Sequence, residues 1–324
     1  MVAKIAIIGA GIAGLIIAKK MINQGLSVDI FDKGRAVGGR MSSRRTQWGY
    51  LDHGTQYFTV KNPIFQKFIE QNQSIVKVWK GKFAHWEEGN FTSIKPDNLR
   101  YVPTIAMNNL CKNMAIELNI KLQTRIISLE KAQTWTLTDE NNEKYFDYDY
   151  IIVTAPPLQT IDLLDNHSFI IESIRKLKMF ACYSSMLIPE NKLDIPFDGI
   201  EFKHPILGWI ALNDSKPSRG EKGAIIIQSN FSWAEANLEQ TRESICTILK
   251  NVTEEVLNIK FQNNLYESLH LWRYAIPQQS NDQGYYFDKF NNIGVCGDWC
   301  LNGKVESAFL SGYYLAEKII EIFV

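Results

Sequence analysis

Residues 4–14 read Lys-Ile-Ala-Ile-Ile-Gly-Ala-Gly-Ile-Ala-Gly, an apolar, β-branched run followed by spaced glycines. The run predicts a strand, and the glycines predict a tight turn into a helix. Gly9 lets the chain turn off the strand, Gly11 lets backbone N–H groups approach a pyrophosphate, and Gly14 lets helix and sheet pack closely. This stretch therefore predicts a dinucleotide-binding unit, with the phosphates at the positive end of the helix.

The following segment offers an acidic side chain to a ribose. A helical pattern covers residues 15–24, Gly25 closes it, and residues 28–31 predict a second strand. Asp32 comes 18 residues after Gly14, at the end of this strand, where a carboxylate would accept hydrogen bonds from the ribose hydroxyls. A strand, turn and helix without a nucleotide is the alternative, because glycine-rich turns also occur by chance.

A glycine pair and a cation follow the second strand. Residues 33–41 read Lys-Gly-Arg-Ala-Val-Gly-Gly-Arg-Met, and this segment could fold back over the same pyrophosphate. A bare NAD domain has no need of such a second clamp, whereas FAD held across both halves of a protein does. Here the chain resembles the FAD-dependent oxidoreductases with the glycine-glycine-arginine motif, the group that contains the flavin amine oxidases.

The composition narrows the class of partner. The 324 residues, 45% of them hydrophobic, suffice for one or two domains with large cores. The 35 basic and 35 acidic residues cancel, which gives no argument for nucleic acid or an anionic membrane. No segment approaches the ~20 apolar residues of a transmembrane helix, and no signal cleavage site follows the apolar N-terminal run. We expect a soluble protein with a small-molecule partner.

The five cysteines are an odd number without zinc-type spacing. They predict reduced thiols, a cytoplasmic location and no metal site. Cys296 and Cys300 could form a redox pair beside a flavin, but they lack the Cys-x-x-Cys spacing, which favours a buried strand cysteine and an incidental loop cysteine.

Residues 51–58 read Leu-Asp-His-Gly-Thr-Gln-Tyr-Phe, and polar groups with a glycine in a short extended run suggest backbone close to a ligand. This segment, after Gly-Gly-Arg-Met, resembles the renalase-like family, which carries a similar Asp-His-Gly-x-Gln-Tyr-Phe stretch. The resemblance implies that Gly54, Thr55 and Gln56 border the isoalloxazine ring. His53 is either part of that site or a satisfied core histidine.

Two segments farther along suggest substrate contacts. Residues 268–274 alternate as a strand does, which places His270 and Trp272 on one face, better suited to a planar heteroaromatic ligand than to an aliphatic core. Renalase-like proteins carry a similar His-x-Trp segment, and also a loop similar to Asn-Asp-Ser-Lys-Pro at residues 213–217. Asn213 is therefore a candidate substrate contact, with a plain turn as the alternative for the loop and an aromatic inter-domain face as the alternative for the strand.

The closing segment contains a strand at residues 293–296, then Gly297 and Asp298, then a helix over about residues 305–322. In FAD proteins of the kind it resembles, the Gly-Asp pair binds the ribityl and phosphate part, and the helix starts under the flavin pyrimidine. A helix N-terminus there would stabilise the negative charge of the reduced flavin. Renalase-like sequences commonly carry arginine at the position of Lys304, so a substrate contact at that position is an open question.

The intervening chain predicts further elements. Asn62 and Pro63 cap a helix to about residue 73, Pro103 opens a helix to about residue 118, and a capping box at Ser232 opens a helix toward Val252. Residues 120–127 predict a strand, with backbone near Ile126 placed to hold adenine, and residues 135–146 predict a hairpin.

Together these patterns predict an α/β fold: a Rossmann-type doubly wound FAD-binding domain with an inserted mixed α+β substrate domain, an amine-oxidase-like two-domain architecture. We expect residues 1–60, 100–156 and 290–324 to form the FAD domain and residues 61–99 and 157–289 to form the substrate domain. The expected cofactor-binding residues are Gly9, Gly11, Ile12, Ala13, Gly14, Asp32, Lys33, Gly39, Arg40, Met41, Gly54, Thr55, Gln56, Ile126, Gly297, Asp298, Val305 and Glu306. The expected substrate-side residues are Gln56, Asn213, His270, Trp272 and Lys304.

The expected activity is that of an FAD-dependent oxidase with noncovalently held FAD. The family resemblance implies hydride transfer from a dihydropyridine isomer of NADH or NADPH to flavin N5, with O2 reoxidising the flavin to give H2O2. Aromatisation drives such a transfer, so no general base is required. A flavin amine oxidase acting on a small amine or polyamine, and a flavin-binding module without turnover, are the alternatives.

Overall fold

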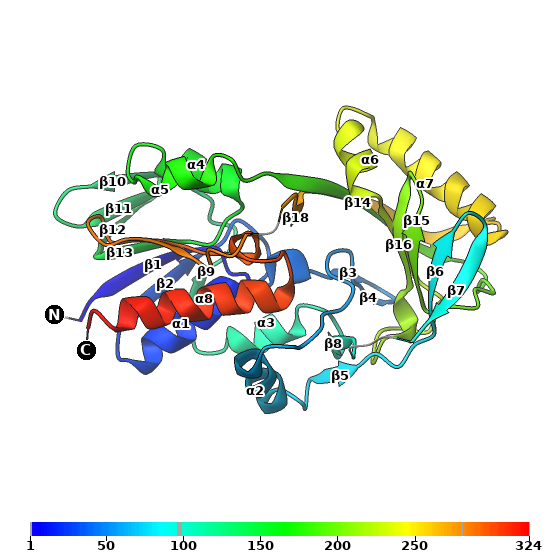
Figure 1. The fold of residues 1–324 in the computed structure, drawn as a ribbon, viewed down its shortest axis with the longest axis horizontal. Helices are drawn as coiled ribbons and strands as arrows, with labels where there is room; N and C mark the ends of the chain where they lie inside the picture. Colours follow the sequence, from blue (N-terminus) through cyan, green and yellow to red (C-terminus); the bar gives the residue numbers. More distant parts are fainter. Residues whose placement is uncertain (1, 96–98, 280, 324) are drawn as a thin grey trace.

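The computed structural model describes residues 2–95, 99–279 and 281–323. The chain forms two lobes side by side, and the described chain begins and ends at the outer end of the first lobe (Figure 1).

A six-stranded sheet forms the centre of the first lobe, in the order β19-β20-β13-β1-β2-β9. Neighbouring strands pair in parallel, except for the antiparallel edge pair of β19 and β20. The strands are β1 (Lys4–Ile8), β2 (Ser27–Phe31), β9 (Asn119–Lys121), β13 (Tyr150–Val153), β19 (Tyr286–Asp288) and β20 (Ile293–Val295). The predicted Rossmann-type domain is thereby confirmed.

Both faces of this sheet are covered. One face carries α1 (Ile12–Asn23), α3 (Asn109–Met114) and α8 (Val305–Ile320); the other carries β10 (Ile126–Lys131), β11 (Trp135–Asp139), β12 (Lys144–Tyr148), α4 (Pro157–Leu164) and α5 (Ile170–Ile174). In β1, Ile5 and Ile7 pack with α1 and α8, whereas Ala6 and Ile8 pack with the three-stranded sheet and α4. Because successive side chains point to opposite faces, a strand that is apolar throughout serves both cores.

A seven-stranded sheet forms the second lobe, in the order β18-β14-β17-β16-β15-β6-β7. Its strands are β6 (Phe83–Glu87), β7 (Asn90–Ile94), β14 (Met179–Pro189), β15 (Gly199–Lys203), β16 (Leu207–Leu212), β17 (Ile225–Ser229) and β18 (Asn264–Pro277), with α6 (Phe231–Ala236) and α7 (Arg242–Leu257) on the outer face. Ile225 and Ile227 pack under α7, whereas Ile226 faces the first lobe and joins its core. The inner face of this sheet is thus part of the junction between the lobes.

Short elements complete the junction. They are α2 (Pro63–Gln71), the paired strands β3 (Arg44–Thr46) with β4 (Gly49–Leu51) and β5 (Val76–Val78) with β8 (Tyr101–Pro103), and the 3₁₀ turns η1 (Gly39–Met41), η2 (Asn213–Ser215) and η3 (Asp298–Cys300). Asn62 caps α2, since its side chain accepts a hydrogen bond from the Ile64 N–H at 2.9 Å.

The lobes differ from the expected segments at three places, one of which is β19, an edge strand of the first sheet although residues 157–289 were expected in the second lobe. Residues of α4 and α5, including Leu164 and Ile171, lie in the core of the first lobe, although residues 157–289 were expected in the second. Phe65 of α2 likewise packs against Phe309 of α8, with ring centroids 5.0 Å apart. After β13 the chain therefore returns to the second sheet only at β14.

The prediction that a helix begins at Pro103 is wrong. Pro103 ends β8, and Ile105 has a φ of 70°, a left-handed conformation that a helix cannot contain. Helix α3 begins only at Asn109. The strand expected over residues 120–127 is two strands, β9 and β10, because the chain turns at Gln123, whose φ is 55°.

The prediction that a capping box at Ser232 begins one helix toward Val252 is also wrong. The cap is Asn230, whose side chain accepts hydrogen bonds from the N–H groups of Ser232 and Trp233. Helix α6 ends at Ala236, and a separate helix, α7, starts after Thr241. Asparagine ranks with serine as a cap, so the earlier residue takes the position.

Among the described residues, every helix is too short or too polar to cross a membrane.

Candidate functional site

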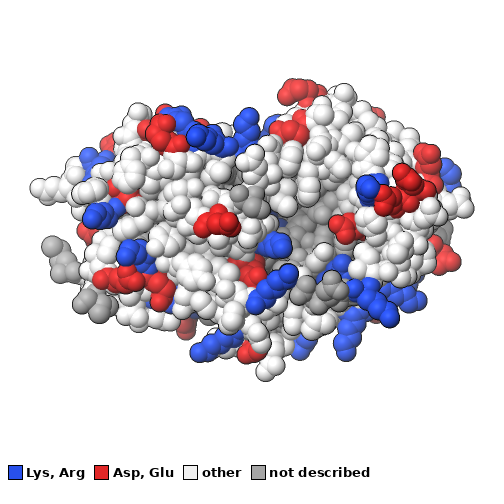
Figure 2. Space-filling model, in the orientation of Figure 1, with Lys and Arg blue, Asp and Glu red and all other residues white. Residues whose placement is uncertain are grey.

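A cavity of about 1020 Å³ lies at the junction, with walls from both lobes. Ligand pockets usually measure roughly 300–1,000 Å³, so this cavity has room for a large cofactor. Figure 2 shows the molecular face hollowed between the lobes, with basic and acidic side chains interspersed over the rest of that face.

The glycine turn after β1 forms the middle of one wall. Gly9 has a φ of 117°, which favours glycine, and a side chain on Gly14 would approach the Gly9 carbonyl oxygen to 2.1 Å. Gly11, by contrast, faces open space, so a ligand can approach its backbone. Gly9, Gly11, Ile12 and Ala13 line the cavity, and Gly14 lies behind it as the contact between helix and strand.

The Gly-Gly-Arg segment lies over this turn, as a second clamp requires. The Gly38 N–H donates to the Ala10 carbonyl at 2.9 Å. Gly39 packs close to Gly11, since a Cβ atom added to Gly39 would lie 3.6 Å from the Gly11 Cα. Gly39, Arg40 and Met41 all line the cavity. The turn and the clamp therefore enclose the start of α1, where the unpaired N–H groups and helix dipole favour an anion.

Asp32 stands at one end of the cavity. Its carboxylate accepts hydrogen bonds from the N–H groups of Ala10 and Gly34, both at 2.6 Å. Lys33 and Ile126 line the same end. The Lys33 pKa is lowered by burial and by the nearby Arg125 charge, partly offset by Asp32.

Arg40 and Asp298 form a two-pronged ion pair in the middle of the cavity. One Arg40 nitrogen donates to Asp298 Oδ2 at 2.8 Å, and the other contacts Oδ1. Arg40 also donates to the Ala275 carbonyl at 3.1 Å. This carbonyl is available because β14 and β18 change register between Phe180 and Cys182, a bulge that leaves Ala275 out of the ladder.

The start of α8 opens into the cavity beside this pair. Gly297, Lys304 and Val305 line the wall, and Lys304 caps the helix without a side-chain hydrogen bond. Glu306 does not line the cavity, although it was expected to hold the cofactor. Its Oε1 accepts from the N–H groups of Lys61 and Asn62, each at 2.7 Å.

An aromatic cluster of His53, His270 and Trp272 closes the far end. The His53 ring stacks on Trp272 with centroids 5.3 Å apart and lies 4.8 Å from His270. Burial and the neighbouring charges of His270 and Arg44 lower the His53 pKa to about 4, and burial with Arg44 and Arg242 lowers that of His270 to about 4. Both imidazoles are therefore neutral at pH 7.

His53 is not a satisfied core histidine. It is 6% exposed, lines the cavity, and its Nδ1 has no hydrogen-bond partner among the described residues. Thr55 is also in the wall, and its N–H donates to the Arg40 carbonyl at 2.9 Å. Gly54 between them lies against Arg40, where a Cβ would come within 2.0 Å of the Arg40 carbonyl oxygen.

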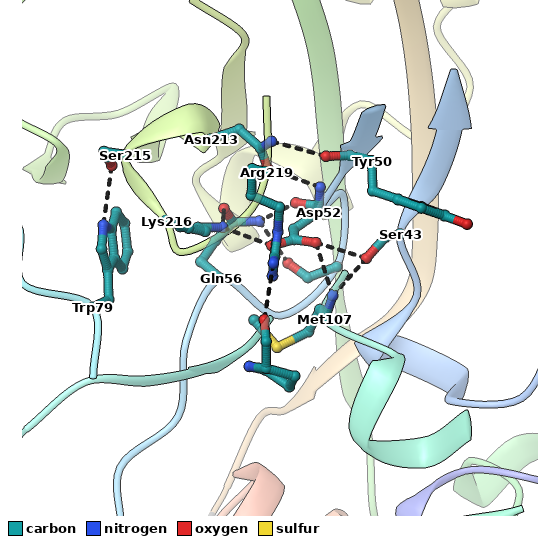
Figure 3. A network of polar contacts seen from close by, with 12 residues as sticks. Ser43, Tyr50, Asp52, Gln56, Trp79, Met107, Asn213, Ser215, Lys216 and Arg219 are labelled. Atoms are coloured by element: carbon teal, nitrogen blue, oxygen red, sulfur yellow. Dashed lines mark hydrogen bonds and ion pairs between the residues drawn. The ribbon is translucent and has the colours of Figure 1, made fainter. Parts of the chain in front are cut away.

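Two expected substrate contacts, Asn213 and Gln56, do not line the cavity, and Figure 3 shows the contacts that they make instead. The Asn213 amide is fully buried, accepts from the Asp52 N–H at 3.0 Å and donates to the Tyr50 carbonyl at 2.9 Å. The Gln56 amide donates to the Gly54 carbonyl at 2.9 Å and accepts from Lys216 at 2.9 Å. Both amides hold backbone rather than facing the cavity.

Several wall residues carry no recognisable signal in the sequence. Gln159 and Asp162 come from α4, whose position over the cavity depends on the chain path after β13. Arg242 comes from the first turn of α7 and contacts the Leu269 carbonyl. Cys300 is fully buried and absent from the wall, and burial raises the pKa of its thiol.

Comparisons with known proteins agree with this fold. A family model for an NAD(P)-binding Rossmann-like domain matches residues 7–71. A 4,4'-diapophytoene desaturase from Staphylococcus aureus (strain MRSA252) is 35% identical over 80 residues, which cover 22% of this chain and 16% of the desaturase. The chain thus matches only about a sixth of the length of this curated relative.

Solved structures match over nearly the whole chain. A candidate protoporphyrinogen oxidase from Exiguobacterium sp. 255-15 has a TM-score of 0.81 at 11% identity, with 98% of each chain covered. A putrescine oxidase triple mutant has a TM-score of 0.74 at 11% identity, with 99% of each chain covered. The chain therefore shares the two-domain fold of these two oxidase structures.

Proposed function

We propose that this protein is an oxidase that holds FAD noncovalently in the cavity between its lobes. The observation that carries the proposal is the continuous wall from Asp32 through the glycine turn and the Arg40–Asp298 pair to the His53, His270 and Trp272 cluster. Asp32 would hold the ribose, the start of α1 the pyrophosphate, and the start of α8 the flavin pyrimidine. The bound flavin would supply hydride acceptance at N5, and O2 would reoxidise it to give H2O2.

The proposed donor is an isomeric dihydropyridine form of NADH or NADPH. Its ring would lie against Trp272 and the neutral imidazoles of His53 and His270, which suit a planar heteroaromatic group. Loss of hydride from a dihydropyridine needs no base, in keeping with imidazoles that are weak bases because their pKa values are lowered to about 4. The cations Arg44 and Arg242 act on the histidines, and at His53 the effect of Arg44 exceeds that of the acid Asp52. They favour a donor that carries phosphate.

An amine oxidase is the second candidate, supported by the structural likeness to putrescine oxidase. A polyamine would need an acidic partner, however. Three acids line the cavity: Asp32 is engaged by backbone N–H groups, Asp298 by Arg40, and Asp162 comes from α4. A flavin-binding module without turnover is the third candidate.

Anaerobic stopped-flow absorbance separates these candidates. The FAD-loaded protein would be mixed separately with 2- and 6-dihydro-NAD(P), ordinary NADH and a panel of amines. Rapid bleaching of the flavin band near ~450 nm by the isomers alone supports the proposal. Bleaching only by amines would replace it with an amine oxidase, and no bleaching by any donor would leave the non-catalytic module. A cytoplasmic location is part of the proposal and could be tested by fractionation.

A further inference from the structure

A buried ionic cluster is centred on Asp52, the residue before His53 in the chain (Figure 3). It consists of Asp52, Lys216 and Arg219, whose side chains are all 0% exposed. Lys216 Nζ lies 3.2 Å from Asp52 Oδ2, and two Arg219 nitrogens donate to the same oxygen at 2.8 and 3.0 Å. We call these three residues the Asp52 cluster.

The Asp52 cluster carries one more positive than negative charge. Burial and the Arg219 charge lower the Lys216 pKa to about 8, partly offset by Asp52, so the amine is still protonated at pH 7. The nearest other acid on this loop, Asp214, accepts from the N–H groups of Gly223 and Ala224. Asp52 is thus the acid that the two cations share.

An unbalanced buried charge is expensive, because removal from water costs several kcal/mol per ion and one carboxylate offsets only one cation. On stability grounds alone, a single cation beside Asp52 would suffice. Arg219 also donates to the carbonyls of Pro103 and Pro217 at 2.8 and 3.1 Å, and Lys216 Nζ lies 5.2 Å from the centroid of the Trp79 ring. These neutral partners stabilise the cations but leave the excess positive charge, which can act on a negative charge elsewhere.

The cavity wall provides the connection. Lys216 donates to Gln56 Oε1 at 2.9 Å, and Gln56 Nε2 donates to the Gly54 carbonyl at 2.9 Å and to the Asp52 carbonyl. Gln228 donates to the same Gly54 carbonyl at 2.7 Å, and Trp272 donates to the His53 carbonyl at 2.8 Å. The cluster is thus two hydrogen bonds from a backbone segment that faces the cavity.

We propose that the excess positive charge of the Asp52 cluster raises the reduction potential of the flavin, by stabilising the negative charge that the flavin gains on reduction. The inference rests on the proposed function, since it needs FAD in the cavity. Lys216 and Arg219 are positioning residues in this account: they touch neither flavin nor donor and act through the charge of the Asp52 cluster. In the dry interior such a charge acts over longer distances than in water.

The test compares reduction potentials of the FAD-loaded protein and three variants, measured by slow reduction against reference dyes. Lys216→Met and Arg219→Met each leave one cation paired with Asp52, so each removes the excess charge by a different route. Ser215→Ala is the matched control, because Ser215 is on the same loop but accepts its hydrogen bond from Trp79, at 3.0 Å. Thermal unfolding and FAD affinity are measured on all four proteins.

We expect both charge variants to lower the equilibrium constant for two-electron reduction by about tenfold, or ~30 mV, while Ser215→Ala matches the wild type. A wild-type potential in both variants would overturn the inference. A change in Lys216→Met alone would also overturn it, because the Gln56 contact rather than the charge would then be responsible.

The remaining outcomes are equally decisive. If both charge variants lose FAD while Ser215→Ala keeps it, the cluster maintains the shape of the site and the electrostatic role is wrong. If the wild-type protein itself binds no FAD, the proposed function fails and this inference fails with it. A wild-type protein that binds FAD but is reduced by no donor would still give the potentials that decide the inference.

Discussion

At the residue scale, Asp52 balances part of the charge of two buried cations, Lys216 and Arg219. Its buried carboxylate accepts from Ser43 at 2.6 Å and from the Met107 N–H at 3.0 Å, besides its two cations. Burial raises its pKa, but Lys216, Arg219 and the hydrogen bonds lower it further, so the net shift is downward. The carboxylate is therefore charged at all ordinary pH values, and the cations depend on it.

Replacing Asp52 by asparagine should destabilise the protein strongly. Asp52→Asn leaves two buried cations without an acid, and breaking a buried pair in this way costs about 3–5 kcal/mol. Urea unfolding of the wild type and the variant measures the difference. Lys216→Met is the control, since it leaves a neutral Asp52–Arg219 pair and should cost less. An Asp52→Asn cost below about 1 kcal/mol would contradict the account.

The two histidines of the cavity predict a loss of stability in acid. Their pKa values are lowered from 6.5 to about 4 in the folded protein, mainly by burial. Between those values the unfolded chain binds more protons, so the free energy of unfolding should be unaffected by these groups above pH 6.5 and fall as the pH drops toward 4.

Melting temperatures between pH 7 and 4.5 would measure this fall. The double variant His53→Asn, His270→Asn should show a weaker dependence on pH over that interval, whereas His85→Asn, on β6 and outside the cavity wall, serves as the control. An equally steep fall in the double variant would assign the effect to other groups.

At the scale of elements, the packing of α1 against α8 fixes the site, because both helices begin at the cavity. A side chain on Gly312 of α8 would approach the Ala13 carbonyl oxygen to 2.4 Å. The helices meet so closely only because this position has no Cβ.

Gly312→Ala should therefore push α8 away from α1, with a cost of about 1–3 kcal/mol and weaker FAD binding. Chemical unfolding and titration of flavin fluorescence would measure the two effects. Lys318→Ala, on the exposed side of the same helix, removes only a surface ion pair and should leave both unchanged. Unchanged FAD affinity in Gly312→Ala would show that the site does not depend on this contact.

Some helices and strands could be predicted from the sequence, and others could not. The β1, α1 and β2 unit was predictable because its glycines, apolar period and terminal carboxylate are local signals. The start of α3 was not, because it depends on the left-handed conformation of Ile105, which an isoleucine rarely adopts. Ser232 was mistaken for a cap because Asn230, two residues earlier, competes for the same N–H groups.

The residues of the candidate site were likewise predictable only where the sequence signal is local. Residues next to a local signal, such as Gly11, Asp32 and Asp298, do line the cavity. Asn213 and Gln56 do not, because their surroundings come from partners about 160 residues away, and no pattern in a single sequence indicates those contacts. The pairing of Arg40 with Asp298, separated by 258 residues, was equally hidden.

For the whole molecule, a cavity with walls from both lobes links cofactor binding to global stability. FAD at 100 times its dissociation constant should stabilise the folded protein by about 2.7 kcal/mol, if it binds only the folded chain. Calorimetry of apoprotein and FAD-loaded protein should show one transition that moves to higher temperature. If only part of the unfolding transition moved, the cofactor would be bound within one lobe.

The register change in the ribbon of β14 and β18 has a mechanical consequence. Eight register pairs lie on the second-lobe side of the break and two on the other side, so Arg273, Tyr274 and Ala275 in between have no register partner in the ladder. These three residues are themselves part of the cavity wall. The ladder is therefore interrupted where the strand forms the wall, and a local distortion of β18 at this place would change the shape of the cavity.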